Sequence, residues 1–214
     1  MVLATPPTTT EKRLTLADYF ALELESECRH ELERGALREM PGERDINLQI
    51  AMFLALYLAQ LGIPSRRLRI GTEIVTESDR ATVRQPDLVV LSEELAATMA
   101  KDKRSTIMPE FPAPDLVVEV VSPGKENSDR DYRYKRSEYA VRRIGEYWII
   151  DPAREVVSVL EWVDGFYEAA EFSGEGAIAS PFLAQLLGQD QLQLKVKALL
   201  AGNLEGNLEG NLEP

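Results

Sequence analysis

The sequence predicts a single α/β or α+β domain in which helices flank a mixed central β-sheet. Its 214 residues are 44% hydrophobic and 28% charged, which is ordinary for a chain that buries a substantial core. Helix-like and strand-like segments alternate along it. One strand-like run, residues 114–122, is almost continuously apolar, which is typical of a strand covered on both faces.

The first third of the chain is expected to form a hairpin and one long helix. Alternating residues around Arg34 and Gly35 indicate two strands joined by a tight turn. The next segment is apolar on most helical faces, starts near the candidate cap Asp45 and ends at Gly62. The expected order is a disordered tail at 1–12, a helix at 14–27, an N-terminal β-hairpin at 29–40 and a buried central helix at 45–62.

The remainder alternates between strands and helices, and residues 13–201 are expected to form the domain. The sequence Gly-Asn-Leu-Glu then repeats three times, which is too poor in apolar residues for a packed element. The expected order is strands at 66–77 and 81–92, a surface helix at 93–103, a strand at 114–122, a charged helix at 128–143, strands at 146–151, 155–163 and 165–173, one or two helices between 181 and 201, and a flexible tail at 202–214.

Composition excludes several classes of protein. No apolar run approaches the roughly 20 residues of a membrane helix, and the first residues lack the pattern of a secretory signal, so a cytoplasmic protein without membrane partners is expected. Cys28 and His30 are the only residues of their kinds, which excludes disulfide frameworks and Cys/His zinc sites within one chain. His30 lies in the hairpin, where a structural role is favoured.

The charge balance limits any interaction with nucleic acid. The chain has 36 acidic and 24 basic residues, a formal charge of −12. An acidic surface repels a phosphate backbone, so nucleic-acid binding needs a local basic patch or screening by metal ions. Candidates for such a patch are Arg130, Arg133, Arg136, Arg142 and Arg143, with Arg66, Arg67 and Arg69.

Two acids lie inside strand-like runs. A buried carboxylate costs several kcal/mol unless a cation, a metal or hydrogen-bond donors compensate it. By the two-residue period, Asp87 points with Val89 and Glu119 points with Val117. If these faces meet on adjacent strands, the two carboxylates converge on one hard cation such as Mg²⁺. Alternatively, Asp87 starts a turn or strand and Glu119 forms a structural ion pair.

The charged helix supplies a candidate partner for these acids. Asp131 lies one turn before Lys135, and the same stripe holds Tyr132 and Tyr139. Large tyrosine rings on this stripe indicate that Lys135 faces inward, where its ammonium could reach the strand that carries Glu119. An Asp and a Lys at this spacing also form an ordinary helix-stabilising pair.

Four blocks in order carry a resemblance to a known family: "QPDLVVLS", "PDLVVEVVSP", "DRDYRYKRSEYA" and "EYWIIDP". They resemble the Uma-two type proteins, a bacterial group abundant in cyanobacteria, which belong to the PD-(D/E)xK nuclease superfamily of restriction-endonuclease-like folds. The likeness extends from about Leu14 to Leu200. The resemblance implies a restriction-endonuclease-like sheet and a phosphodiesterase that depends on Mg²⁺ or Mn²⁺.

The resemblance also implies roles for individual residues. Asp87 and Glu119 would bind the metal, and a lysine would orient the attacking water or stabilise charge in the transition state. The superfamily places that lysine two residues after the glutamate, where this chain has Val121. Lys135 matches the lysine's place in the Uma-two group, and Lys125 is its rival. One further residue, Glu31, matches an acid that recurs near the site, as a ligand or a partner of metal-bound water.

We therefore expect a metal-dependent endonuclease that acts on DNA, as a homodimer, with Arg130, Arg133 and Arg136 contacting the phosphates. Two other functions stay open. One is a catalytically inactive assembly or regulatory module on the same fold, which the acidic balance and the missing strand lysine favour. The other is a hydrolase of a small phosphorylated substrate, to which an acidic protein is better suited than to duplex DNA.

Overall fold

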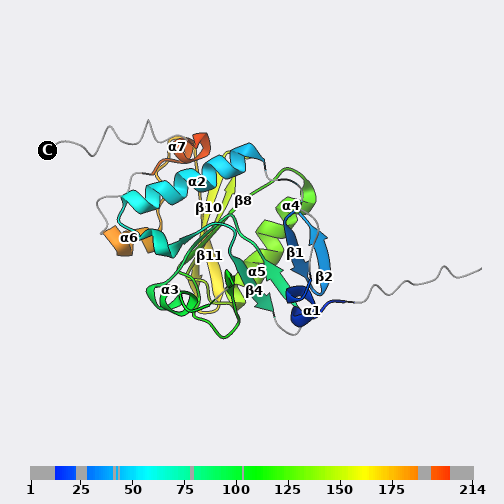
Figure 1. Ribbon diagram of the computed structural model, residues 1–214. Helices are drawn as coiled ribbons and strands as arrows, with labels where there is room; N and C mark the ends of the chain where they lie inside the picture. The colour runs from blue at the N-terminus through cyan, green and yellow to red at the C-terminus, as the bar shows by residue number, and fades with distance from the viewer. Residues whose placement is uncertain are drawn as a thin grey trace, which may run out of the picture.

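The computed structural model describes residues 13–22, 28–40, 42, 44–77, 80–102, 104–187 and 194–202. Within these ranges the strands form two mixed sheets with helices around them (Figure 1). The predicted mixed α/β class is confirmed, although the strands divide between two sheets instead of forming one. The predicted tails at 1–12 and 202–214 lie outside the described residues, except for Gly202.

The larger sheet has the strand order β11-β10-β9-β8-β6-β3, in which β8 and β9 are parallel and the other neighbours antiparallel. Because β8 and β9 lie in its middle, they are covered on both faces and consist almost entirely of buried residues. The strands are β3 (Leu68–Arg69), β6 (Leu88–Val90), β8 (Leu116–Val120), β9 (Glu146–Asp151), β10 (Val156–Val163) and β11 (Phe166–Ser173).

The smaller sheet has the order β2-β1-β5-β4-β7, and only its β4–β7 pair is parallel. It contains the predicted N-terminal hairpin, with Arg34 and Gly35 both at positive φ in the turn. The strands are β1 (His30–Glu33), β2 (Ala36–Glu39), β4 (Glu73–Glu77), β5 (Thr82–Arg84) and β7 (Thr106–Ile107). His30 is the first residue of β1 and therefore lies in the hairpin, as predicted.

The helices surround these sheets, and several predicted helices need correction; the surface helix predicted at 93–103, for example, ends at Met99. The helix predicted at 14–27 is only α1, ending at Phe20, and residues 23–27 lie outside the described ranges. The charged helix begins at Lys125 instead of Ser128, and its middle turn is a π-helix. The helices are α1 (Leu16–Phe20), α2 (Asp45–Gln60), a 3₁₀ turn η1 (Ser65–Arg67), α3 (Glu93–Met99), α4 (Lys125–Asp129), the π-helix η2 (Arg130–Lys135), α5 (Arg136–Val141), α6 (Pro181–Leu187) and α7 (Val196–Ala201).

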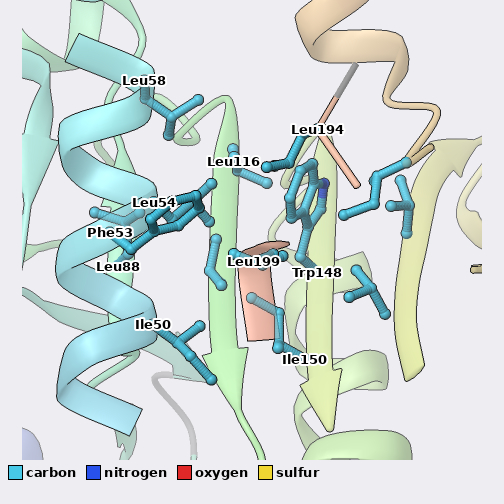
Figure 2. Packing of buried hydrophobic residues seen from close by; sticks show 14 of the residues in the cluster. Ile50, Phe53, Leu54, Leu58, Leu88, Leu116, Trp148, Ile150, Leu194 and Leu199 are labelled. Carbon is cyan, nitrogen blue, oxygen red and sulfur yellow. The ribbon is translucent and has the colours of Figure 1, made fainter. Parts of the chain in front are cut away.

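Helix α2 lies on one face of the larger sheet and is not the buried central helix that its composition predicts. Its inner residues pack against β8 and β9, and Figure 2 shows Leu54 and Leu58 directed at this sheet, with Trp148 on the neighbouring strand. On the outer face, Leu48 and Met52 are 50% and 51% exposed. Apolar residues occur on both faces of α2, so its pattern could not reveal which face is buried. No described helix is long and apolar enough to span a membrane.

Candidate active site

Asp87 and Glu119 lie on neighbouring strands of the larger sheet. Asp87 directly precedes β6, Glu119 is in β8, and these strands pair antiparallel with Leu88 opposite Val118. Extending this register by one residue places Asp87 opposite Glu119. Val89, two residues after Asp87, lies in the same apolar cluster as Val117 and Val121, which are two residues before and after Glu119. Both acids therefore belong to one face of the sheet.

Hydrogen bonds fix Asp87 to the strand that carries Glu119. The amide of Val120 donates to Asp87 Oδ2 at 2.6 Å, and the amide of Asp87 donates to the carbonyl of Val118 at 3.1 Å. The other carboxylate oxygen, Oδ1, lies 3.9 Å from Nη1 of Arg29. Asp87 therefore continues the β6–β8 ladder and presents its carboxylate beside that of Glu119.

The π-helix brings Lys135 to the same place. Gly124, at φ 114°, turns the chain from β8 into α4, and the π-helix follows. Lys135 is only 3% exposed. Its Nζ lies 2.7 Å from Oε2 of Glu119, 3.3 Å from Oδ1 of Asp131 and 3.5 Å from Oε1 of Glu31. The inward orientation of Lys135 predicted from the tyrosine stripe is confirmed.

The three carboxylates keep Lys135 charged. Burial alone would lower the pKa of its ammonium, but Glu119, Glu31 and Asp131 together raise that pKa above its ordinary value. A lysine with a raised pKa holds its proton at neutral pH. Lys135 is therefore a fixed cation and is unsuited to act as a general base.

Glu119 has partners for both carboxylate oxygens. The hydroxyl of Tyr139 donates to Oε1 at 2.7 Å, and Lys135 pairs with Oε2. Burial raises the pKa of Glu119 to about 7, with further contributions from Asp131 and Glu31, although Lys135 opposes them. Each carboxylate oxygen has a second lone pair, so these contacts still leave acceptor capacity toward a cation.

Glu31 supports the cluster from behind. Arg84 donates to its Oε2 at 3.0 Å, and the amide of Gln85 donates to its Oε1 at 3.1 Å. Burial would raise the pKa of Glu31, but Lys135 and Arg84 lower it to about 2. Arg84 also binds both oxygens of Glu138, each at 2.8 Å. Protein donors thus surround Glu31, and its geometry is that of a residue that positions Lys135.

A cavity of about 50 Å³ opens in front of the acids. A cavity needs roughly 10–15 Å³ to hold one water molecule. The space therefore suits a hydrated ion or one phosphoryl group, not a whole nucleoside. Three acids and three bases contribute to its wall. The lining residues are Arg29, Met40, Gln85, Asp87, Glu119, Val120, Ser122, Asn127, Arg130, Asp131 and Lys135.

The structure separates the two candidate lysines. Lys125 has a side chain that is 85% exposed, and it pairs with Asp129 on the surface of α4. Lys135 is buried against Glu119. Val121, where the superfamily has its lysine, is packed in the apolar cluster beneath that acid.

The predicted phosphate-binding arginines do not form one group. Arg130 lines the cavity. Arg133 has a side chain that is 70% exposed, and Arg136 donates to the carbonyl of Tyr167 at 2.8 Å. Most of the further arginines bind protein groups. Arg66 pairs with Glu93 and Arg67 with Asp115, whereas Arg142 donates to the carbonyls of Met108, Pro109 and Phe111 and Arg69 donates to carbonyls of its own segment. Arg143 lines a separate surface pocket.

Four contributors to the site receive no role from the sequence. Asp131 and Tyr139 are recognised there as neighbours of Lys135, but their contacts with Lys135 and Glu119 inside the site are not predicted. Arg29 and Arg84 gave no signal, because their partners Gln85 and Glu138 are more than fifty residues away in sequence.

The donor set fits a hard divalent ion. The carboxylates of Asp87, Glu119 and Asp131 line one cavity, and Mg²⁺ is commonly held by one or two carboxylates with waters and substrate phosphates. Within the described ranges, no group of three or more His, Cys, Asp or Glu side chains is arranged to hold a metal. Asp87 and Glu119, which the strand register places opposite each other, are the carboxylates that would hold such an ion.

Comparisons with known proteins identify a family and a similar fold. The model of the Uma2 family, described as "Putative restriction endonuclease", matches residues 16–194. A crystal structure described as a "putative nuclease" from Anabaena variabilis has a similar fold, with a TM-score of 0.64 and 17% sequence identity, covering 88% of this chain and 98% of that one. No curated protein matches this chain.

Proposed function

The chain belongs to the Uma2 family of restriction-endonuclease-like proteins, and on this basis we propose that it is a metal-dependent endonuclease that hydrolyses phosphodiester bonds in DNA. The observation that carries the proposal is the cavity that Asp87 and Glu119 both line, beside the buried ammonium of Lys135. Apolar packing does not require this arrangement, because burying these charges is costly.

Asp87 and Glu119 would hold Mg²⁺ or Mn²⁺ through their carboxylate oxygens. When bound, such an ion supplies Lewis acidity toward a phosphoryl oxygen and lowers the pKa of a coordinated water. The protein contributes the fixed positions of the two donors: the amide of Val120 holds Asp87, and the hydroxyl of Tyr139 holds Glu119. Preorganised donors do not need to reorient during the reaction.

Lys135 would stabilise negative charge on the phosphoryl oxygens or orient the attacking water. Its pKa is raised, so it stays protonated and donates hydrogen bonds. Asp131 and Glu31 hold the ammonium from two other directions, which keeps it at the site when Glu119 shares its charge with a metal. Lys135, on a helix, would thus supply the ammonium group that Val121, at the usual position on the strand, cannot supply.

The size of the cavity favours a substrate whose bulk stays outside. Its volume accommodates a phosphoryl group and an ion, whereas a small phosphorylated metabolite would need an enclosing pocket. A DNA backbone presents its phosphates on the outside of a larger molecule, and Arg130 at the wall offers a cation to them. A homodimer would provide two such sites for two strands.

A nicking assay tests the proposal. Supercoiled plasmid is incubated with Mg²⁺ or Mn²⁺ and the parent protein, Asp87→Asn, Glu119→Gln or Lys135→Met. We expect each variant to lose at least about a hundredfold in rate, because each removes a group placed at the reacting phosphate. Lys125→Met is the control, since it removes an exposed lysine from a neighbouring turn. Equal cleavage by all five proteins would contradict the assignment.

A catalytically inactive module on the same fold is the second candidate. The observation in its favour is that Glu119, Lys135, Asp131 and Glu31 already neutralise one another in part without any ligand. This alternative predicts no divalent-ion binding by the parent in a calorimetric titration. The proposed nuclease predicts binding that Glu119→Gln removes.

A further inference from the structure

Arg29 is held at the rim of the cavity by the side chain and backbone of one residue. Its Nε donates to Oε1 of Gln85 at 2.9 Å, and its Nη2 donates to the carbonyl of Gln85 at 2.8 Å. Nη1 lies 3.9 Å from Oδ1 of Asp87, which is an ion-pair distance. The guanidinium is therefore oriented by Gln85, with Nη1 directed toward the acid and the cavity.

Gln85 is itself fixed on the protein. Its amide donates to Glu31 at 3.1 Å, and its Nε2 donates to the carbonyl of Gly71 at 3.0 Å. The network therefore runs from the residues behind Lys135 to the guanidinium at the rim. A planar guanidinium that is already oriented loses little conformational freedom when it binds an oxyanion.

The charges on the cavity wall explain when an anion would enter. Three carboxylates, on Asp87, Glu119 and Asp131, face three cations, on Arg29, Arg130 and Lys135, so the formal charges of this wall cancel. A bound divalent ion would add two positive charges, and a phosphodiester would then restore part of the balance. Metal and phosphate binding at one site should therefore strengthen each other reciprocally.

We propose that Arg29, oriented by Gln85, is a phosphate-binding residue of this site and contacts a non-bridging oxygen of the substrate once Asp87 shares its charge with a metal. The inference rests on the proposed nuclease function and extends it by assigning the anion subsite. Arg29 touches substrate in this scheme, and Gln85 is a positioning residue.

Binding of a phosphorothioate oligodeoxynucleotide, whose linkages hydrolyse slowly, tests the subsite. Fluorescence anisotropy is measured with Mn²⁺ and with EDTA for the parent, Arg29→Met, Arg29→Lys and the control Arg38→Met. Arg38 lies on the same hairpin, is largely exposed and is absent from the cavity wall. Calorimetric titration with Mn²⁺ checks that each variant keeps its fold and metal site.

We expect Mn²⁺ to tighten binding to the parent, and Arg29→Met to weaken binding in Mn²⁺ by about tenfold and reduce the salt dependence by about one phosphate contact. The affinity of Arg29→Lys should lie between those of the parent and Arg29→Met, because lysine keeps the positive charge but loses the two bonds that orient the guanidinium on Gln85. Binding by Arg29→Met that equals that of Arg38→Met would overturn the subsite, even if the parent cleaves DNA. Failure of the parent to cleave plasmid, with Mn²⁺-dependent binding still lost in Arg29→Met, would instead reject the nuclease and keep the subsite.

Discussion

The two faces of the larger sheet differ in what they bury. On one face, α2 and α7 cover an apolar cluster that includes Leu54, Trp148 and Leu199 (Figure 2). On the other face, the apolar cluster surrounds Glu119 and its charged partners. Strand β8 serves both, because alternate residues such as Val118 and Glu119 point in opposite directions. One strand therefore contributes to an apolar core on one side of the sheet and to a charged cluster on the other.

The difference between the faces is energetic. Burying apolar surface stabilises the fold, whereas burying charges requires each to have a partner, and a buried pair is weak evidence for added stability. In the charged cluster, every carboxylate oxygen of Glu31 and Glu119 has a donor. The charges of this cluster are paired, yet such pairs add little to the stability of the fold. A cluster of this kind is expected where function, and not folding, requires the charges.

The largest effect is expected from Lys135→Met on the charged face. The change leaves the carboxylates of Glu119, Asp131 and Glu31 without their shared cation, and breaking a buried ion pair typically costs about 3–5 kcal/mol. Urea unfolding should show a loss of this size at neutral pH. Lys125→Met should change the unfolding free energy by less than about 0.5 kcal/mol, because Lys125 is exposed. A Lys135→Met protein as stable as this control would show that the cluster is not tightly coupled.

A similar or smaller loss is expected from Leu54→Ala on the apolar face. Leu54 is fully buried, and truncating such a residue typically costs about 2–5 kcal/mol. The folded variant should bind Mn²⁺ and cleave plasmid like the parent, since the change lies across the sheet from the cavity. Loss of metal binding in a folded Leu54→Ala protein would mean that the two faces are not independent.

Part of this arrangement follows from the sequence alone. Two-residue alternation predicts that Asp87 and Glu119 share a face with their apolar neighbours, and the tyrosine stripe predicts that Lys135 points inward. These features depend on residues close together in sequence. The hairpin around Arg34 and Gly35 is predicted for the same reason.

Features that depend on distant contacts were not predictable. The segments 66–77 and 81–92 each contribute strands to both sheets, and no local periodicity marks the change of sheet. The buried pairing of Arg84 with Glu138 joins residues 54 apart in sequence. The π-helix is likewise not marked in the sequence, because its residues have an ordinary helical pattern that fits either geometry.

The smallest expected effect is the pH dependence of Mn²⁺ binding, which involves the charged face of the sheet and not the apolar one. Burial raises the pKa of Glu119 to about 7, so its folded-state carboxyl is protonated more easily than in the unfolded chain. This group destabilises the fold above its folded pKa, and the penalty is relieved as pH falls. A metal ligand must be deprotonated, so Mn²⁺ affinity should rise as pH increases through about 7, by up to about tenfold per pH unit below that value.

Calorimetric titration of Mn²⁺ across this pH range, in the parent and in Glu119→Gln, tests the central claim most directly. We expect the parent to bind one ion, with an affinity that rises with pH and with release of a proton below the pKa of Glu119, and we expect Glu119→Gln to lose this binding. Equal affinity in both proteins, or no binding by the parent at any pH, would contradict the assignment of Asp87 and Glu119 as the metal ligands.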